Sequence, residues 1–82
     1  MGTMEEEARA RLSEATKVRD DVRKAVIYLQ RARDHCVRTR FDSRLGMAYE
    51  ELTKLLGYAE AMVIEYELDV ARWTNLHQAR EV

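Results

Sequence analysis

Three residues of this 82-residue chain have side chains that commonly bind metals or act as nucleophiles: His35, Cys36 and His77. In a helical hairpin that turns near residue 41, the two histidines lie about 45 Å apart, at a rise of about 1.5 Å per residue. They cannot bind one metal within a single chain, and only an antiparallel dimer could bring them together. We expect His35 to be an ordinary helix-end residue and Cys36 to be a small buried hydrophobic residue.

Motifs of known catalytic chemistry are also missing from the sequence. It contains no Gly-rich phosphate loop, no CxxC, no HExxH and no Gly-x-Ser-x-Gly. The carboxylate pairs Glu50/Glu51 and Glu65/Glu67 are one or two positions apart, so they do not share a helix face and are typical of a solvated surface. We therefore predict a protein that is not an enzyme and has no catalytic residue, metal or cofactor.

Apolar residues in the first half of the chain alternate in steps of four and three, which predicts a helix over about residues 4–38. Thr3 and Glu6 fit a capping box at its start. Arg19 and Arg33 fill the gaps in an apolar row formed by Ala8, Leu12, Ala15, Val22, Val26, Leu29 and Cys36.

The second half repeats this spacing and predicts a helix over about residues 44–79. Its main row is Leu45, Ala48, Leu52, Leu55, Ala59, Met62, Tyr66, Asp69, Trp73 and Leu76, with a second row at Tyr49, Leu56, Val63 and Val70. Within the main row, Asp69 is expected to pair with Arg19 or to point to water. Arg33 is expected to extend to the edge of the seam or to meet Glu50 or Glu51.

The apolar pattern lapses between the two helices, over about residues 39–43, where Asp42 or Ser43 is a natural N-cap. A short connection favours antiparallel neighbours, so we predict one all-α domain, residues 1–82, folded as a two-helix antiparallel hairpin. Residues 1–41 carry ten basic and seven acidic side chains, and residues 42–82 carry four and eight, which favours pairing of the two arms. No Gly or Pro enforces the break, so one long helix through position 41 is the alternative.

Composition also bears on location. No apolar run approaches the roughly 18 residues of a membrane span. The acidic N-terminus does not resemble a secretory signal, and a single cysteine gives no reason for an oxidising compartment, so we expect a cytoplasmic protein without membrane contact. The second methionine, Met4, suggests that residues 1–3 derive from a vector.

The stretch 52–64 places apolar groups on most of the helix circumference, whereas a surface helix has one apolar stripe. Gly57 indicates either a close helix contact or a tolerated surface glycine. We therefore predict a non-catalytic interaction module that completes a four-helix bundle with a second copy or with another helical protein. Its expected partner-binding residues are Leu52, Leu55, Leu56, Ala59, Met62, Val63, Tyr66 and Trp73.

An alternative function follows from arginines near the turn, which could contact phosphates of a nucleic acid in a small dimeric hairpin. These residues are Arg31, Arg38, Arg40 and Arg44. The acidic second helix, the scarcity of lysine and the lack of a recognition-helix arrangement disfavour this alternative.

The segments 49–56 (YEELTKLL) and 59–66 (AEAMVIEY), placed after an acidic start, a first helix and a short polar turn, give the chain a familiar layout. Over about residues 12–76 it resembles the small co-chaperones of type III secretion needle proteins. The resemblance implies a cytoplasmic bacterial protein that, with a second chaperone, keeps a polymerising needle subunit soluble. It assigns no functional residue.

Overall fold

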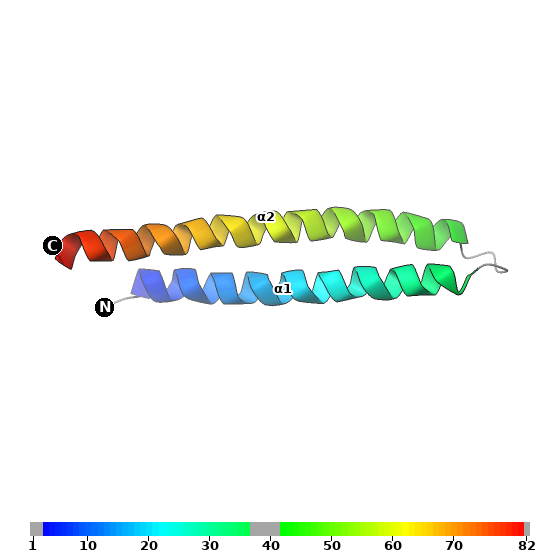
Figure 1. Ribbon diagram of the computed structural model, residues 1–82, viewed down its shortest axis with the longest axis horizontal. Helices are drawn as coiled ribbons and strands as arrows, with labels where there is room; N and C mark the ends of the chain where they lie inside the picture. Colours follow the sequence, from blue (N-terminus) through cyan, green and yellow to red (C-terminus); the bar gives the residue numbers. More distant parts are fainter. Residues whose placement is uncertain (1–2, 37–41, 82) are drawn as a thin grey trace.

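Two antiparallel helices packed side by side make up the fold (Figure 1). The computed structural model describes residues 3–36 and 42–81, and of these the side chains of 4–36 and 43–75. Helix α1 spans Thr3–Asp34 and helix α2 spans Asp42–Glu81. This confirms the all-α two-helix hairpin and excludes a single long helix through position 41.

The molecule is a thin rod of 66 × 15 × 13 Å. α2 has 40 residues and α1 has 32, so α2 extends past the start of α1 (Figure 1). Each helix therefore has one neighbour, and the rest of its circumference has no cover from the described part of the chain.

Charge placement within each helix accounts for much of its local stability. Glu5 and Glu6 lie in the first turn of α1, where the helix dipole favours negative charge. Glu5 also accepts a hydrogen bond from Arg9 at 2.9 Å, a pair four residues apart that contributes about 0.3–0.5 kcal/mol. The other ion pairs of the described side chains are also within one helix: Arg11 with Glu7, Arg19 with Asp20, and Lys54 with Glu51.

α1 ends four residues before the position expected from the sequence. The His35 N–H donates to the Arg31 carbonyl at 3.1 Å, and the Cys36 N–H donates to the Arg33 carbonyl at 3.0 Å. The second bond spans three residues, and such tightening commonly closes the last turn of a helix. α2 begins at Asp42, so residues 42 and 43 of the expected turn are helical and residues 39–41 lie outside the described residues. The capping box expected at Thr3 also lies outside, because the Thr3 side chain is not among those described.

The seam between the helices uses the predicted row of α1 and, on α2, residues from both of the predicted rows. Ala48, Leu55 and Met62 are exposed, and Tyr49, Leu56, Val63 and Val70 are buried or half-buried instead. Leu52, Ala59, Tyr66 and Trp73 of the main row are also buried or half-buried, so α2 is rotated only slightly from the predicted orientation. Asp69 and Val70 are both half-buried, so the two rows are not separated at this end of the seam.

The core enclosed by this seam is very small. Among the side chains described, the buried ones are Ala8, Ala15, Ala59 and Val63, and no large side chain is fully buried. Large apolar side chains remain exposed on both helices: Met4, Val18, Ile27, Tyr28, Met47, Leu55, Tyr58, Met62, Ile64 and Leu68. The hairpin by itself therefore leaves most of its hydrophobic surface in water.

Candidate protein–protein interface

Arg33 crosses the seam close to the turn end of the hairpin. Its guanidinium carbon lies 5.3 Å from the centroid of the Tyr49 ring, a cation–π contact between the two helices. Arg33 also lies close to the α2 backbone, because a Cβ added at Gly46 would stand in ordinary contact, 4.0 Å from Arg33 Nη2. The expectation that Arg33 meets Glu50 or Glu51 is therefore wrong, since the guanidinium is held against an aromatic face.

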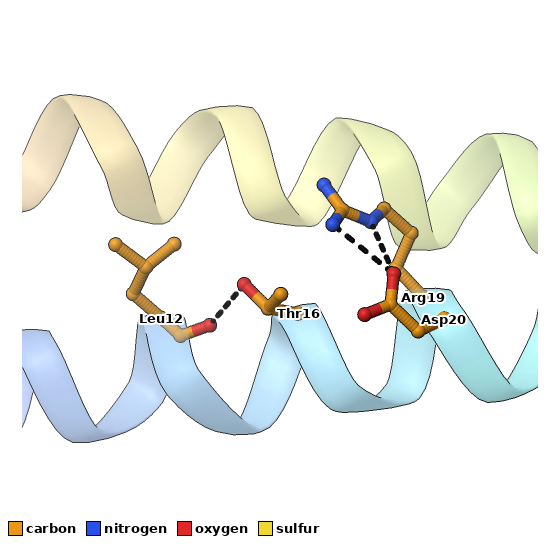
Figure 2. Close-up of polar contacts among 4 residues, drawn as sticks. All are labelled: Leu12, Thr16, Arg19 and Asp20. Carbon is orange, nitrogen blue, oxygen red and sulfur yellow. Dashed lines mark hydrogen bonds and ion pairs between the residues drawn. The ribbon is translucent and has the colours of Figure 1, made fainter.

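Arg19 occupies the seam near the middle of α1 and turns back to its own helix (Figure 2). Its Nε and Nη2 donate to Asp20 Oδ1 at 3.2 and 3.1 Å. The neighbouring Thr16 donates to the Leu12 carbonyl at 2.8 Å, so this hydroxyl is satisfied without crossing the seam (Figure 2).

Of the two expectations for Asp69, the pairing with Arg19 does not occur, because Arg19 bonds Asp20. Arg19 lines a shallow hollow with Glu60 and Glu67, whereas Asp69 lines another with Arg11. Arg11, the α1 side chain that shares a hollow with Asp69, is eight residues before Arg19, which is about 12 Å at helical rise. The antiparallel register therefore places the two side chains at different heights.

The candidate chemical groups do not come together in the part of the chain that is described. His35 is exposed just past the end of α1, and Cys36 is half-buried rather than buried. The side chain of His77 lies outside the described residues. No group of three or more His, Cys, Asp or Glu side chains that could hold a metal occurs among the described residues.

One long side of the hairpin is apolar, and we call it the side face. Leu55 and Met62 of α2 are seven residues apart and 48% and 43% exposed, and Val18 of α1 is 52% exposed. Val18 and Met62 line the same hollow, so both rows lie on one side of the hairpin. The side face consists of Val18, Ala25 and Ala32 from α1 and of Ala48, Leu55 and Met62 from α2.

The opposite side of the seam is charged. Arg19 and Arg23 of α1 line a hollow there with Glu60 and Glu67 of α2. Basic and acidic side chains therefore face each other across the hairpin on this side, although none of these four makes an interhelical ion pair in the described structure. The side face is not free of charge, since Arg11 and Glu14 line its hollow with Val18 and Met62, but it has an apolar row from each helix.

A second apolar stripe runs along the outside of α2, and we call it the outer face. Its residues alternate in steps of four and three and are all exposed: Gly57, Ala61, Ile64, Leu68 and Ala71. The stripe borders α1 at its centre, because Ile64 lines a hollow with Arg19 and Arg23 of α1 and Leu68 lines one with Arg11. Leu68 and Ala71 line a shallow hollow with Arg72 and Asn75, all from α2.

The eight residues predicted to bind a partner fall into two groups. Ala59 and Val63 are buried on the seam, where α1 is their neighbour, and Leu52, Leu56, Tyr66 and Trp73 are half-buried there. Of the eight predicted residues, Leu55 and Met62 are the two that are exposed, and both lie on the side face. The sequence-based prediction did not include Val18, Ile64 or Leu68. Signals for them exist in the sequence: apolar residues seven apart at 18, 25 and 32 mark the side face, and apolar residues in steps of four and three over 57–71 mark the outer face.

The arginines proposed for nucleic acid are only partly described. Arg31 is exposed, with its guanidinium carbon 5.5 Å from the Tyr28 ring centroid, and Arg44 is exposed near the start of α2. Arg38 and Arg40 lie outside the described residues. The proposed surface therefore stays a prediction, since the structure describes two of its four side chains.

Comparison with known proteins adds no relative: no family model, no curated protein and no solved structure matches the chain. Within the described residues, neither helix has a stretch both long and apolar enough to cross a membrane.

Proposed function

We propose that this chain is a non-catalytic protein–protein interaction module that completes its hydrophobic core with helices from another molecule. The observation that carries the proposal is the side face. There, Val18, Leu55 and Met62 are about half exposed. Each helix contributes a row of residues seven positions apart, and all six residues of the two rows are apolar: Val18, Ala25 and Ala32 on α1, and Ala48, Leu55 and Met62 on α2.

The spacing of the side face indicates a bundle rather than an isolated hairpin. A seam between two helices needs apolar residues at two of every seven positions, whereas a helix that faces the core of a bundle has apolar residues at three of every seven. Here the third position is provided by Ala25 and Ala32 on α1 and by Leu55 and Met62 on α2. Helices laid on this side, from a second copy or from another helical protein, would bury these side chains.

Met62→Glu tests the proposal, because it places a carboxylate in the middle of the side face. We expect the wild-type hairpin to gain mass and helical content between micromolar and millimolar concentration, or on addition of its helical partner. Met62→Glu should weaken that association by about tenfold or more, the usual effect of losing a central interface anchor. Sedimentation velocity and circular dichroism measure the two quantities.

Thr53→Glu is the matched control, since Thr53 is exposed, lies outside the apolar rows and is on the same helix. It should leave association unchanged. The proposal would be contradicted if the chain were a cooperatively folded monomer at all concentrations and had no helical partner. In that case Met62→Glu and Thr53→Glu would give the same mass and the same helical content.

The resemblance to needle-protein co-chaperones supplies a narrower form of the proposal. In that form the occupant of the side face is a helical subunit that polymerises when uncovered. The purified hairpin, with its second chaperone, should then keep such a subunit soluble in a sedimentation assay, and Met62→Glu should not. Secretion genes flanking the coding sequence would support this form.

Nucleic-acid binding by Arg31, Arg38, Arg40 and Arg44 is tested separately. Phosphate contacts give an affinity that falls steeply between about 50 and 200 mM salt. The absence of binding to duplex or structured RNA at the lower salt concentration would end that alternative.

A further inference from the structure

We infer that the occupant of the side face is a second copy of this chain, packed with its turn at the same end of the rod, so that α1 of each copy lies against α2 of the other. The inference rests on the function proposed above and selects one of its two occupants. The product is a four-helix bundle whose two-fold axis runs along the rod.

The residues of the side face are matched in height between the two helices. Val18 and Met62 line one hollow, and Arg11 and Asp69 line another. Arg11 is seven residues before Val18, and Asp69 is seven residues after Met62, so the two charged residues continue the two apolar rows. The same steps of seven in the other direction put two more pairs of residues level with each other: Ala25 with Leu55, and Ala32 with Ala48.

Arg11 and Asp69 give the open end of the side face two opposite charges. Asp69 is half-buried and makes no ion pair within the described structure, and the ion pair of Arg11 is with Glu7 of its own helix, at 3.9 Å. A two-fold axis along the rod keeps every residue of the second copy at its own height. Arg11 of each copy therefore lies opposite Asp69 of the other, and the symmetry makes this contact twice.

The apolar layers of the side face also match in size across this axis. Val18 of one copy lies opposite Met62 of the other, and Ala25 lies opposite Leu55, so a small side chain meets a large one at both layers. The layer nearest the turn consists of alanines alone. Both helices of the hairpin can therefore keep an even distance from the second copy.

The outer edges of the side face, three positions after each row residue, hold acids and tyrosines of both helices: Glu14, Asp21, Tyr28, Glu51, Tyr58 and Glu65. By the same levels, Asp21 and Glu51 of one copy lie opposite tyrosines of the other, whose hydroxyls can donate to them. Glu14 lies opposite Glu65, a contact of like charge. Arg11 lines a hollow with each of these two glutamates in its own hairpin, which reduces the repulsion.

A second copy with its turn at the opposite end fits less well. Centred on the same layer, it would stack Ala25 on Ala25 and Leu55 on Leu55, so the two α1 helices would have to approach more closely than the two α2 helices. It would set α2 against α2, from the half of the chain with eight acidic and four basic side chains. Arg11 and Asp69 of the two copies would lie at opposite ends of the rod.

A charge exchange between Arg11 and Asp69 tests the inference in the full chain. Arg11→Glu and Asp69→Arg are made as separate variants, and each places like charges at both contacts of its own dimer. We expect either variant alone to self-associate about tenfold more weakly than the wild type, since two favourable pairs are lost and two unfavourable ones are formed. Sedimentation velocity measures the association.

Mixing the two variants should restore the dimer. In a mixed dimer the new glutamate of one variant lies opposite the new arginine of the other, and native Arg11 lies opposite native Asp69. The mixed dimer should therefore outnumber the two same-variant dimers in native mass spectrometry, which separates the three by mass. Like charges remain within each hairpin, so recovery on mixing cannot come from a contact inside one chain.

Arg23→Glu and Glu60→Arg form the matched control pair. These residues share a hollow on the opposite side of the seam, and the two substitutions change the charge in the same way. At about 150 mM salt, which screens charges more than about 8 Å apart, the control mixture should give mixed dimers in the statistical proportion. Circular dichroism checks that all four variants keep their helical content.

Three results would overturn the inference: a wild-type chain that is monomeric up to millimolar concentration, no excess of mixed dimers from Arg11→Glu and Asp69→Arg, or an equal excess from the control pair. The proposed function is judged separately by Met62→Glu. A monomeric chain that binds a different helical protein through Met62 would keep the function and exclude the second copy. Self-association that depends on Met62 without an excess of mixed dimers would keep the function and exclude this arrangement.

Discussion

At the scale of single residues, the seam combines small apolar side chains with two arginines that are held in different ways. Arg33 lies over the Tyr49 ring of the opposite helix, and Arg19 bonds Asp20 of its own helix. The first contact joins the helices and the second does not. Arg33 therefore contributes to the pairing of the hairpin near its turn, while Arg19 chiefly covers the seam with its aliphatic stem.

A double-mutant cycle measures the contribution of Arg33. Arg33→Met keeps an apolar stem and removes the charge, and Tyr49→Leu removes the ring. We expect a coupling free energy of about 0.5–1 kcal/mol in urea unfolding, the range for a partly exposed cation–π contact. Tyr49→Phe keeps the aromatic face and should retain the coupling, and a coupling near zero would show that the contact does not stabilise the fold.

At the scale of elements, α2 differs from α1 in having apolar residues on three sides. Its seam faces α1, the side face adds Leu55 and Met62, and the outer face adds Ile64 and Leu68. Gly57 lies on the third of these sides with no atom of this chain near it. A glycine in a helix interior costs about 1 kcal/mol relative to alanine, so nothing within the hairpin compensates for its presence.

Gly57→Ala should therefore raise the free energy of unfolding of the isolated hairpin by about 1 kcal/mol. The neighbouring Ala61→Gly should lower it by a similar amount, because both positions are exposed on the same face. Chemical denaturation at low protein concentration measures both changes. A loss of stability in Gly57→Ala would mean that another molecule already contacts this backbone in solution.

At the scale of the whole molecule, a rod 66 Å long with four buried side chains has little hydrophobic stabilisation to spare. Such a fold is sensitive to any charge placed on the seam. The same smallness of the core leaves apolar side chains exposed on both helices, and this is the physical basis of the proposed interaction function.

Val63→Asp should unfold the hairpin, because Val63 is 2% exposed and an unpaired buried carboxylate costs several kcal/mol. Val18→Asp provides the comparison: this valine is half exposed, and the substitution should leave the helical content of the isolated hairpin nearly unchanged. Far-ultraviolet circular dichroism at micromolar concentration distinguishes the two. Equal helicity in both variants would show that the seam does not hold the helices together.

The sequence by itself determined the helices and their separation. Steps of four and three mark every seam position of α1, and Asp42 is one of the two residues indicated as the start of α2. It also indicated that α2 has more apolar surface than one neighbour can cover. These features depend on local periodicity and capping, which neighbouring residues specify without reference to the rest of the fold.

Only the tertiary structure decided which row of α2 faces α1. Residues of both rows can face α1 at a four–three spacing, with either Leu55 or Leu56 and either Met62 or Val63 turned inward, so periodicity could not decide between them. Packing decides, because the observed rotation buries Val63, half-buries Tyr49 and Leu56, and leaves Leu55 and Met62 exposed beside the seam. The same packing sets the register that separates Arg19 from Asp69, because the side chains that meet across the seam decide how far one helix is shifted along the other.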